Sequence, residues 1–130
     1  MTETAKVAAG ENREILLVDD DVTSLDIICF LFEGKGYSVR RCASGEDALK
    51  IVEASAPALL IIDLMMPGLD GFETIKLLRS SGYLRPIIAF TAVDDDEAHR
   101  RVLDVGGDKV LTKPCAPEKL LTVVQQYMKI

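Results

Sequence analysis

The chain has 130 residues, the size of a single domain. A hydrophobic content of 48% with 28% charged residues is typical of a soluble globular protein and excludes a disordered chain. The formal net charge of −6 disfavours direct binding to nucleic acid or to an anionic membrane.

No apolar run approaches the roughly 20 residues that a membrane helix needs, and residues 1–12 contain no hydrophobic signal region. We therefore expect a cytoplasmic protein without a membrane anchor. Its three cysteines, Cys29, Cys42 and Cys115, lack the C-x-x-C spacing of a zinc site, so we expect reduced thiols.

The predicted elements alternate between strand and helix. Residues 1–13 show no sustained period and predict a loose tail, which leaves residues 14–130 for the domain. Strands are predicted from short apolar or alternating runs over residues 14–18, 37–42, 58–62, 86–90 and 110–112. Helices are predicted over about residues 22–34, 44–56, 69–80, 94–105 and 118–129. This alternation predicts an α/β fold with a parallel sheet and helices on both faces.

Polar residues stand at the carboxyl ends of four predicted strands. Asp19 and Asp20 follow the first strand, Asp63 follows a buried apolar run, Thr91 ends another strand and Lys113 follows the last. Parallel strands share one carboxyl edge, so these side chains are expected to converge there. The stretch around Asp63 alone leaves two readings open, a reactive carboxylate or an ordinary turn residue.

A cluster of Asp19, Asp20 and Asp63 needs neutralising cations. Two carboxylates about 4 Å apart repel by about 4 kcal/mol at an effective dielectric of about 20. Lys113 supplies one positive charge, and oxygen ligands favour Mg²⁺ as the source of the rest. Such an edge would accept a phosphoryl group, with Asp63 as the nucleophile and with Thr91 and Lys113 holding the phosphoryl oxygens.

Four motifs together resemble the receiver domains of two-component response regulators. They are Val18-Asp19-Asp20-Asp21, Ile62-Asp63-Leu64-Met65-Met66-Pro67-Gly68-Leu69-Asp70-Gly71, Phe90-Thr91-Ala92 and Leu111-Thr112-Lys113-Pro114. The resemblance covers about residues 14–128. It implies a flavodoxin-like (βα)5 three-layer sandwich whose five-stranded parallel sheet has the order 2-1-3-4-5.

The resemblance also implies a role for each site residue. Asp63 would accept a phosphoryl group from a histidine kinase or a histidine phosphotransfer protein. The Mg²⁺ ligands would be Asp19, Asp20, Asp63 and the backbone carbonyl of Met65. The positions that sense the phosphoryl group would be Thr91, Ala92 and Lys113, and the Lys113–Pro114 peptide bond would be cis. Asp21 is expected to cap the following helix.

One position departs from the pattern of the family. Receiver domains usually carry an aromatic residue three positions before the conserved lysine, and this chain has Val110 there. Valine has no ring to turn inward, so we expect a weaker or differently connected response on the face formed by the last two helices and the last strand.

The first predicted helix leaves two interpretations open. Its core-facing stripe is predicted to contain Ser24, Ile27, Ile28, Leu31 and Phe32. Leu25 and Cys29 flank that stripe, and Phe30 falls on roughly the opposite side. Leu25 and Cys29 either add packing against a neighbouring helix or form a docking patch for the phosphodonor protein.

The predicted function is a stand-alone signalling switch rather than an enzyme with a separate substrate. It would act through an unknown downstream protein, as a monomer or as a phosphorylation-dependent dimer. The alternatives are a phosphorelay intermediate and a fragment of a larger regulator with an output domain. An aspartyl phosphatase would need a second carboxylate where Met65 stands, and a nucleotide binder would need a G-x-G-x-x-G loop that the chain lacks.

Overall fold

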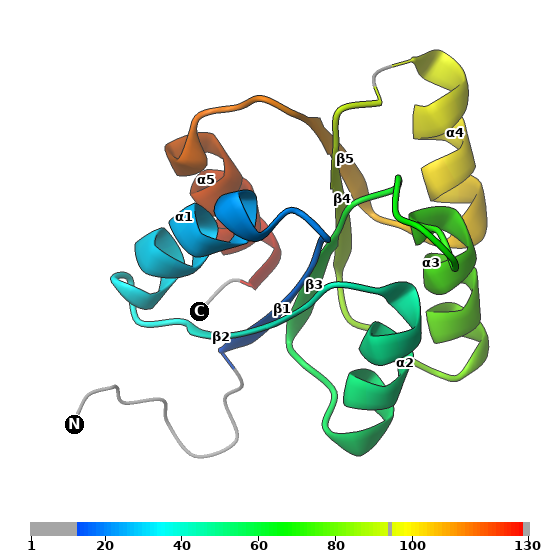
Figure 1. Ribbon diagram of the computed structural model, residues 1–130, viewed down its shortest axis with the longest axis horizontal. Coiled ribbons are helices and arrows are strands. Elements are labelled where there is room, and N and C mark those ends of the chain that lie inside the picture. Colours follow the sequence, from blue (N-terminus) through cyan, green and yellow to red (C-terminus); the bar gives the residue numbers. More distant parts are fainter. Residues whose placement is uncertain (1–12, 94, 129–130) are drawn as a thin grey trace.

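The computed structural model describes residues 13–93 and 95–128, in which five strands and five helices alternate (Figure 1). The predicted tail, apart from Arg13, lies outside the described residues. The elements are β1 (Glu14–Val18), α1 (Val22–Glu33), β2 (Ser38–Cys42), α2 (Gly45–Ala54), β3 (Leu59–Ile62), α3 (Gly71–Ser80), β4 (Ile87–Thr91), α4 (Asp96–Val105), β5 (Lys109–Thr112) and α5 (Pro117–Met128). No helix in the described ranges is long and apolar enough to span a bilayer.

All five strands form one parallel sheet in the order β2-β1-β3-β4-β5, which confirms the predicted α/β flavodoxin-like fold and its strand order. Helices α1 and α5 cover one face of this sheet, and α2, α3 and α4 cover the other (Figure 1). The molecule is therefore the predicted three-layer sandwich.

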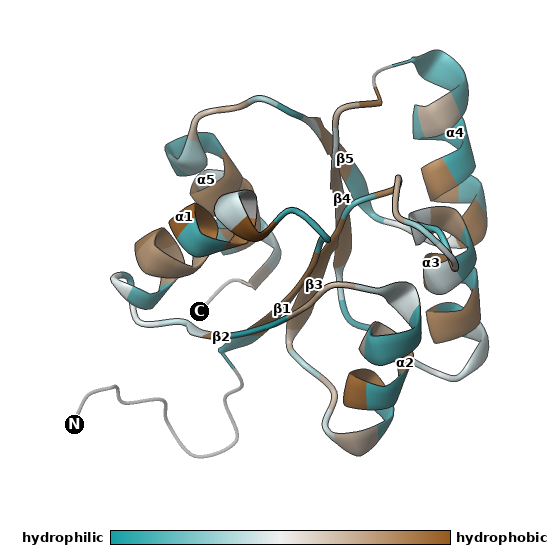
Figure 2. Cartoon of the chain, in the orientation of Figure 1, coloured by the Kyte–Doolittle hydropathy of each residue, from teal (hydrophilic) through white to brown (hydrophobic). Residues whose placement is uncertain are grey.

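The hydrophobic core has two parts, one on each face of the sheet. Along β1, Ile15 and Leu17 pack toward α1 and α5, whereas Leu16 and Val18 belong to the cluster beneath α2, α3 and α4. Successive residues of a strand face opposite sides, so a strand covered on both faces must be apolar throughout. This is why β1, β3 and β4 stand out as hydrophobic segments in Figure 2.

Side-chain caps fix where three of the helices begin. The Ser44 hydroxyl caps α2, and Asp70 forms a capping box with Glu73 at the start of α3. The N-cap of α4 is Asp95, and Asp94, where the predicted helix begins, lies outside the described residues. These caps help to place the loops that enter α2 and α3 next to the carboxyl edge of the sheet.

The core-facing stripe of α1 differs from the prediction. Leu25, Ile28, Cys29 and Phe32 are buried, whereas the side chain of Ile27 is 54% exposed. Both sets have helical spacing because the residues from Ile27 to Phe32 are all apolar, so the periodicity could not fix which side of the helix faces the sheet.

Candidate functional site

Backbone pairing brings the four strand ends to one edge of the sheet. Val18 pairs with Ile62 across β1 and β3, and the Asp63 amide donates to the Val18 carbonyl at 2.9 Å. On the other side, the Lys113 amide donates to the Thr91 carbonyl at 2.7 Å. Residues far apart in the sequence therefore meet at the carboxyl edge.

Three carboxylates gather at this edge. One carboxylate oxygen from each of Asp19, Asp20 and Asp63 lies within 4.8 Å of the other two. Asp19 is buried, Asp63 is half-buried and Asp20 is exposed, so the cluster opens to solvent on the Asp20 side. The convergence predicted from the strand ends is confirmed for these three residues.

The Lys113 ammonium bridges two of the acids. Its Nζ lies 2.5 Å from Oδ2 of Asp19 and 3.6 Å from Oδ2 of Asp63. The same nitrogen lies 5.4 Å from the centroid of the Phe90 ring, which adds a cation–π contact. Lys113 is thus held between the acids and an aromatic face.

The surroundings raise the pKa of both Asp63 and Lys113. Burial raises the pKa of the Asp63 carboxyl, and Lys113, a hydrogen bond from the Met65 amide and one from the Thr91 hydroxyl only partly oppose this effect. Burial alone would lower the pKa of Lys113, but its hydrogen bond to Asp19 and its attraction to Asp63 outweigh that effect and raise the pKa. The ammonium form of Lys113 is therefore the favoured form at the site.

The site carries more negative than positive charge at close range. Three carboxylates face the single ammonium of Lys113, and all of the clustered donor atoms are oxygens. A hard divalent cation with oxygen ligands matches that charge and that donor set, so the residues present fit Mg²⁺. Asp21 is not a member of this cluster; its carboxylate accepts a hydrogen bond from the Thr23 amide at 3.1 Å, as expected for a cap of α1.

The loop after Asp63 turns back tightly against the strand end. The Met65 amide donates to Oδ1 of Asp63 at 3.3 Å, while the Met65 side chain is exposed. A Cβ on Gly71 would lie 2.5 Å from the Asp63 carbonyl oxygen, so only glycine allows α3 to start this close to Asp63.

The remaining predicted positions lie along β4 and β5. Thr91 is fully buried at the end of β4 and Ala92 is exposed just after it. The Lys113–Pro114 bond is cis, as predicted. Val110 is half-buried and packs against the core cluster on the side of α2, α3 and α4.

The docking patch proposed for Leu25 and Cys29 is contradicted. Both residues are buried in the core, with 4% and 8% of their surface exposed, so no partner can reach them. The exposed apolar residues of α1 are instead Val22, Ile27 and Phe30, and Phe30 is 84% exposed.

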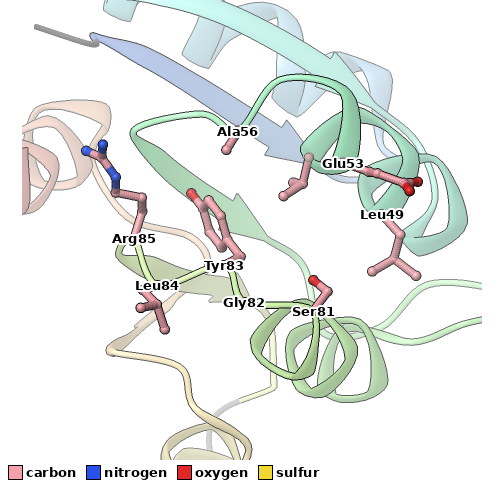
Figure 3. Close-up of a pocket in the computed structure, with 9 residues that line it drawn as sticks. Leu49, Glu53, Ala56, Ser81, Gly82, Tyr83, Leu84 and Arg85 are labelled. Carbon is pink, nitrogen blue, oxygen red and sulfur yellow. The ribbon is translucent and has the colours of Figure 1, made fainter. Parts of the chain in front are cut away.

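A cleft of about 680 Å³ lies at the opposite edge of the sheet, between the end of α2 and the segment that leads into β4 (Figure 3). The Tyr83 hydroxyl that faces this region already donates to the Pro57 carbonyl at 2.9 Å. In Figure 3 the charged ends of Glu53 and Arg85 point away from each other. Because the polar groups of this cleft do not converge, we take the carboxylate cluster at the carboxyl edge of the sheet, and not the cleft, as the candidate functional site.

Sequence reasoning missed one contact near the carboxyl edge of the sheet. Glu46 lies in the first turn of α2, and its Oε2 accepts a hydrogen bond at 3.3 Å from the Leu69 amide in the loop after Asp63. No local pattern shows this contact, because it joins segments 23 residues apart.

Comparison with known proteins agrees with this geometry. Residues 15–125 match the family model of the response regulator receiver domain. The chain is 35% identical over 118 residues to the alkaline phosphatase synthesis transcriptional regulatory protein PhoP of Bacillus subtilis, covering 91% of this chain and 49% of PhoP. It is also 39% identical over 116 residues to an uncharacterized 14.6 kDa protein of Leptolyngbya boryana, covering 88% of each.

A solved structure gives the same result. The receiver domain of the Francisella response regulator 1452 superposes with a TM-score of 0.86 at 32% identity, over 91% of this chain and 98% of that one. The chain spans only about half the length of PhoP, so what PhoP does beyond the shared region is not transferred to this chain.

Proposed function

Because this chain belongs to the response regulator receiver domain family, we propose that it is a phosphorylation-dependent switch in which Asp63 is the phosphoacceptor. Membership of the family makes it a protein of two-component signalling. The single observation that carries the finer proposal is that Lys113 Nζ contacts both Asp19 and Asp63 within the three-carboxylate cluster.

The proposed reaction is a phosphoryl transfer from a phosphohistidine. A carboxylate oxygen of Asp63 forms a bond to phosphorus while the bond between phosphorus and the imidazole nitrogen breaks, and the imidazole leaves with the electron pair. Lys113 and the Thr91 hydroxyl would hold phosphoryl oxygens. Bound Mg²⁺ would neutralise charge on the phosphoryl group, and Asp19, Asp20, Asp63 and the Met65 carbonyl would hold it.

Intact-mass measurement after incubation with Mg²⁺ and a small phosphodonor, acetyl phosphate or phosphoramidate, tests the proposal. We expect a gain of one phosphoryl group that disappears in Asp63→Asn. Asp70→Asn is the matched control, because it removes a carboxylate in the same loop and asparagine still caps α3. A gain of mass that persists in Asp63→Asn would reject Asp63 as the acceptor.

We further propose that the histidine phosphodonor protein docks on α1 and on the loop between β5 and α5. A groove of about 280 Å³ runs between them and is lined by Ile27, Pro114 and Cys115. Lys113 lines the same groove and also contacts Asp63, so a helix seated there would present its side chains to the acceptor. Phe30, exposed one turn after Ile27, would extend the contact.

A phosphorelay intermediate is the second candidate, because the chemistry of Asp63 can run in either direction. Incubating the phosphorylated protein with a histidine phosphotransfer protein distinguishes the two roles. Rapid transfer of the label to histidine supports the relay, and loss of the label to water alone supports the switch.

An output domain in a longer regulator is a separate proposal, motivated by the greater length of PhoP.

A further inference from the structure

The amino-terminal turn of α2 is packed against the loop that carries the acceptor. Gly45 is buried, and a Cβ at this position would lie 2.1 Å from the Thr74 hydroxyl and 3.0 Å from the Leu69 carbonyl oxygen. Because there is no room for a side chain, α2 cannot shift toward or away from this loop without disturbing the contact with Leu69 and Thr74. The next residue, Glu46, is therefore held at a fixed place beside the loop.

Glu46 contacts the loop at Leu69 and occupies the space next to Gly68. Its Oε2 accepts a hydrogen bond from the Leu69 amide at 3.3 Å and lies 3.2 Å from where a Cβ on Gly68 would be. Gly68 has φ of +75°, a conformation that side chains other than glycine rarely adopt. The Glu46 carboxylate therefore lies against the turn in the middle of the loop.

The same loop is fixed at its other points by the acceptor itself. The Met65 amide donates to Asp63, and Gly71 packs on the Asp63 carbonyl oxygen. The segment between these two residues depends on contacts from outside the loop. Glu46 provides one such contact, at the turn that separates Met65 from the start of α3.

We propose that Glu46 is a positioning residue for the acceptor site, holding the loop so that the Met65 backbone faces the acidic cluster. The proposal rests on the proposed function, in which the Met65 carbonyl is a Mg²⁺ ligand. Glu46 itself is exposed and does not belong to the three-carboxylate cluster, so its effect is exerted through the loop.

The negative charge of Glu46 would by itself produce a different pattern of effects. An acid in the first turn of a helix stabilises the helix dipole, and an acid near the site attracts cations. Asp47 has the same charge, the same helical turn and a similar exposure. Glu46→Ala and Asp47→Ala therefore share any general charge effect, and only Glu46→Ala removes the contact with Leu69.

The test measures Mg²⁺ binding by calorimetry and exchange of the Leu69 amide with deuterium, both without a phosphodonor. We expect Glu46→Ala to raise the Mg²⁺ dissociation constant roughly two- to tenfold, the range for losing one hydrogen bond, and to speed exchange at Leu69. Glu46→Gln keeps an acceptor oxygen, so both values should stay near those of the unaltered protein. Asp47→Ala should also leave exchange at Leu69 unchanged.

Each result has one meaning. Equal losses of Mg²⁺ affinity in Glu46→Ala and Asp47→Ala would overturn the positioning role in favour of a charge effect. Unaltered binding in Glu46→Ala, with Mg²⁺ bound by the unaltered protein, would also overturn it. If the unaltered protein binds no Mg²⁺, the proposed metal site fails as well, which separates that outcome from the other two.

Discussion

Asp20 differs from the other two acids of the cluster in its exposure to solvent. Asp19 is buried against Lys113, so removing its charge would leave the ammonium of Lys113 without its nearest partner. Neutralising Asp20 leaves the ion pair between Lys113 and Asp19 intact. It is therefore the residue with which to separate metal binding from stability.

Asp20→Asn should change the response to Mg²⁺ more than it changes the apoprotein. Neutralising one of three neighbouring carboxylates relieves repulsion, so the free energy of unfolding without metal should stay within about 1 kcal/mol of the original or rise. At a concentration of 100 times the dissociation constant, Mg²⁺ should stabilise the unaltered protein by about 2.7 kcal/mol, and the variant by much less. Thermal unfolding with and without Mg²⁺ measures both effects.

The control is Asp104→Asn on the exposed surface of α4, which should keep the full stabilisation. Equal stabilisation of Asp20→Asn and Asp104→Asn by Mg²⁺ would mean that Asp20 is not a ligand.

Cys42, at the end of β2, should be a poor nucleophile at neutral pH. Burial raises the pKa of its thiol from 9.0 to about 11, so the thiolate is scarce in the folded protein. In a variant that keeps only this cysteine, the rate of alkylation should rise with pH up to about 11. The unfolded chain loses the proton first, so this thiol should also lower the stability of the fold as the pH rises from about 9 to 11. An alkylation rate that levels off near pH 9 would contradict the raised pKa.

At the scale of the elements, the sequence predicted strands better than the orientation of helices. A parallel strand covered on both faces is apolar at every position, so β1, β3 and β4 could be recognised without knowing which residue faces which side. A helix has to be oriented about its axis. In α1 the six apolar residues from Ile27 to Phe32 fit two orientations equally well, and only packing on the sheet selects the one that buries Leu25 and Cys29.

That orientation predicts losses of stability of different size for two neighbouring substitutions in α1. Leu25→Ala should lower the free energy of unfolding by about 2–5 kcal/mol, because it leaves a cavity in the core. Ile27→Ala should lower it by less than about 1 kcal/mol, because Ile27 is half exposed. Denaturant unfolding measures both values.

Ile27→Ala should also slow phosphoryl transfer from the histidine protein while leaving phosphorylation by acetyl phosphate unchanged, because only the protein donor uses the groove. Leu77→Ala, an exposed apolar residue on α3, is the matched control and should affect neither reaction. Equal slowing with both donors would place Ile27 in the chemistry of the acceptor and remove the docking role.

At the scale of the whole molecule, the site could be predicted because parallel topology converts distant sequence positions into neighbours. Asp19, Asp63 and Lys113 each follow a strand, and strands that run in one direction end at one edge. The contact between Glu46 and Leu69 could not be predicted in this way, because it depends on how α2 packs beside α3 and not on the sheet. The sequence therefore predicts the charged residues at the ends of the strands more readily than it predicts the residues that contact their loops.

The arrangement of the whole sheet also determines how a conformational change at Asp63 can reach other parts of the molecule. Thr91 and Thr112 are paired across β4 and β5, so a movement of the Thr91 backbone would displace the end of β5. Two residues earlier on that strand stands Val110, whose side chain is half-buried against the core cluster beneath α2, α3 and α4. A small branched side chain in contact with a packed core has few alternative rotamers.

We therefore expect the response to a phosphoryl group to stay close to the acceptor. With Mg²⁺ and beryllofluoride, a phosphoryl mimic, large shifts of backbone amide resonances should occur at Asp63, Thr91 and Lys113, and small ones along α4 and α5. Val110→Tyr should extend the shifts into α4 and β5, because a ring that does not fit the core can occupy either of two positions. Leu103→Tyr, on the exposed side of α4, controls for the added ring. Large shifts throughout α4 in the unaltered protein, with a change of rotamer at Val110, would show that valine transmits the signal without an aromatic side chain.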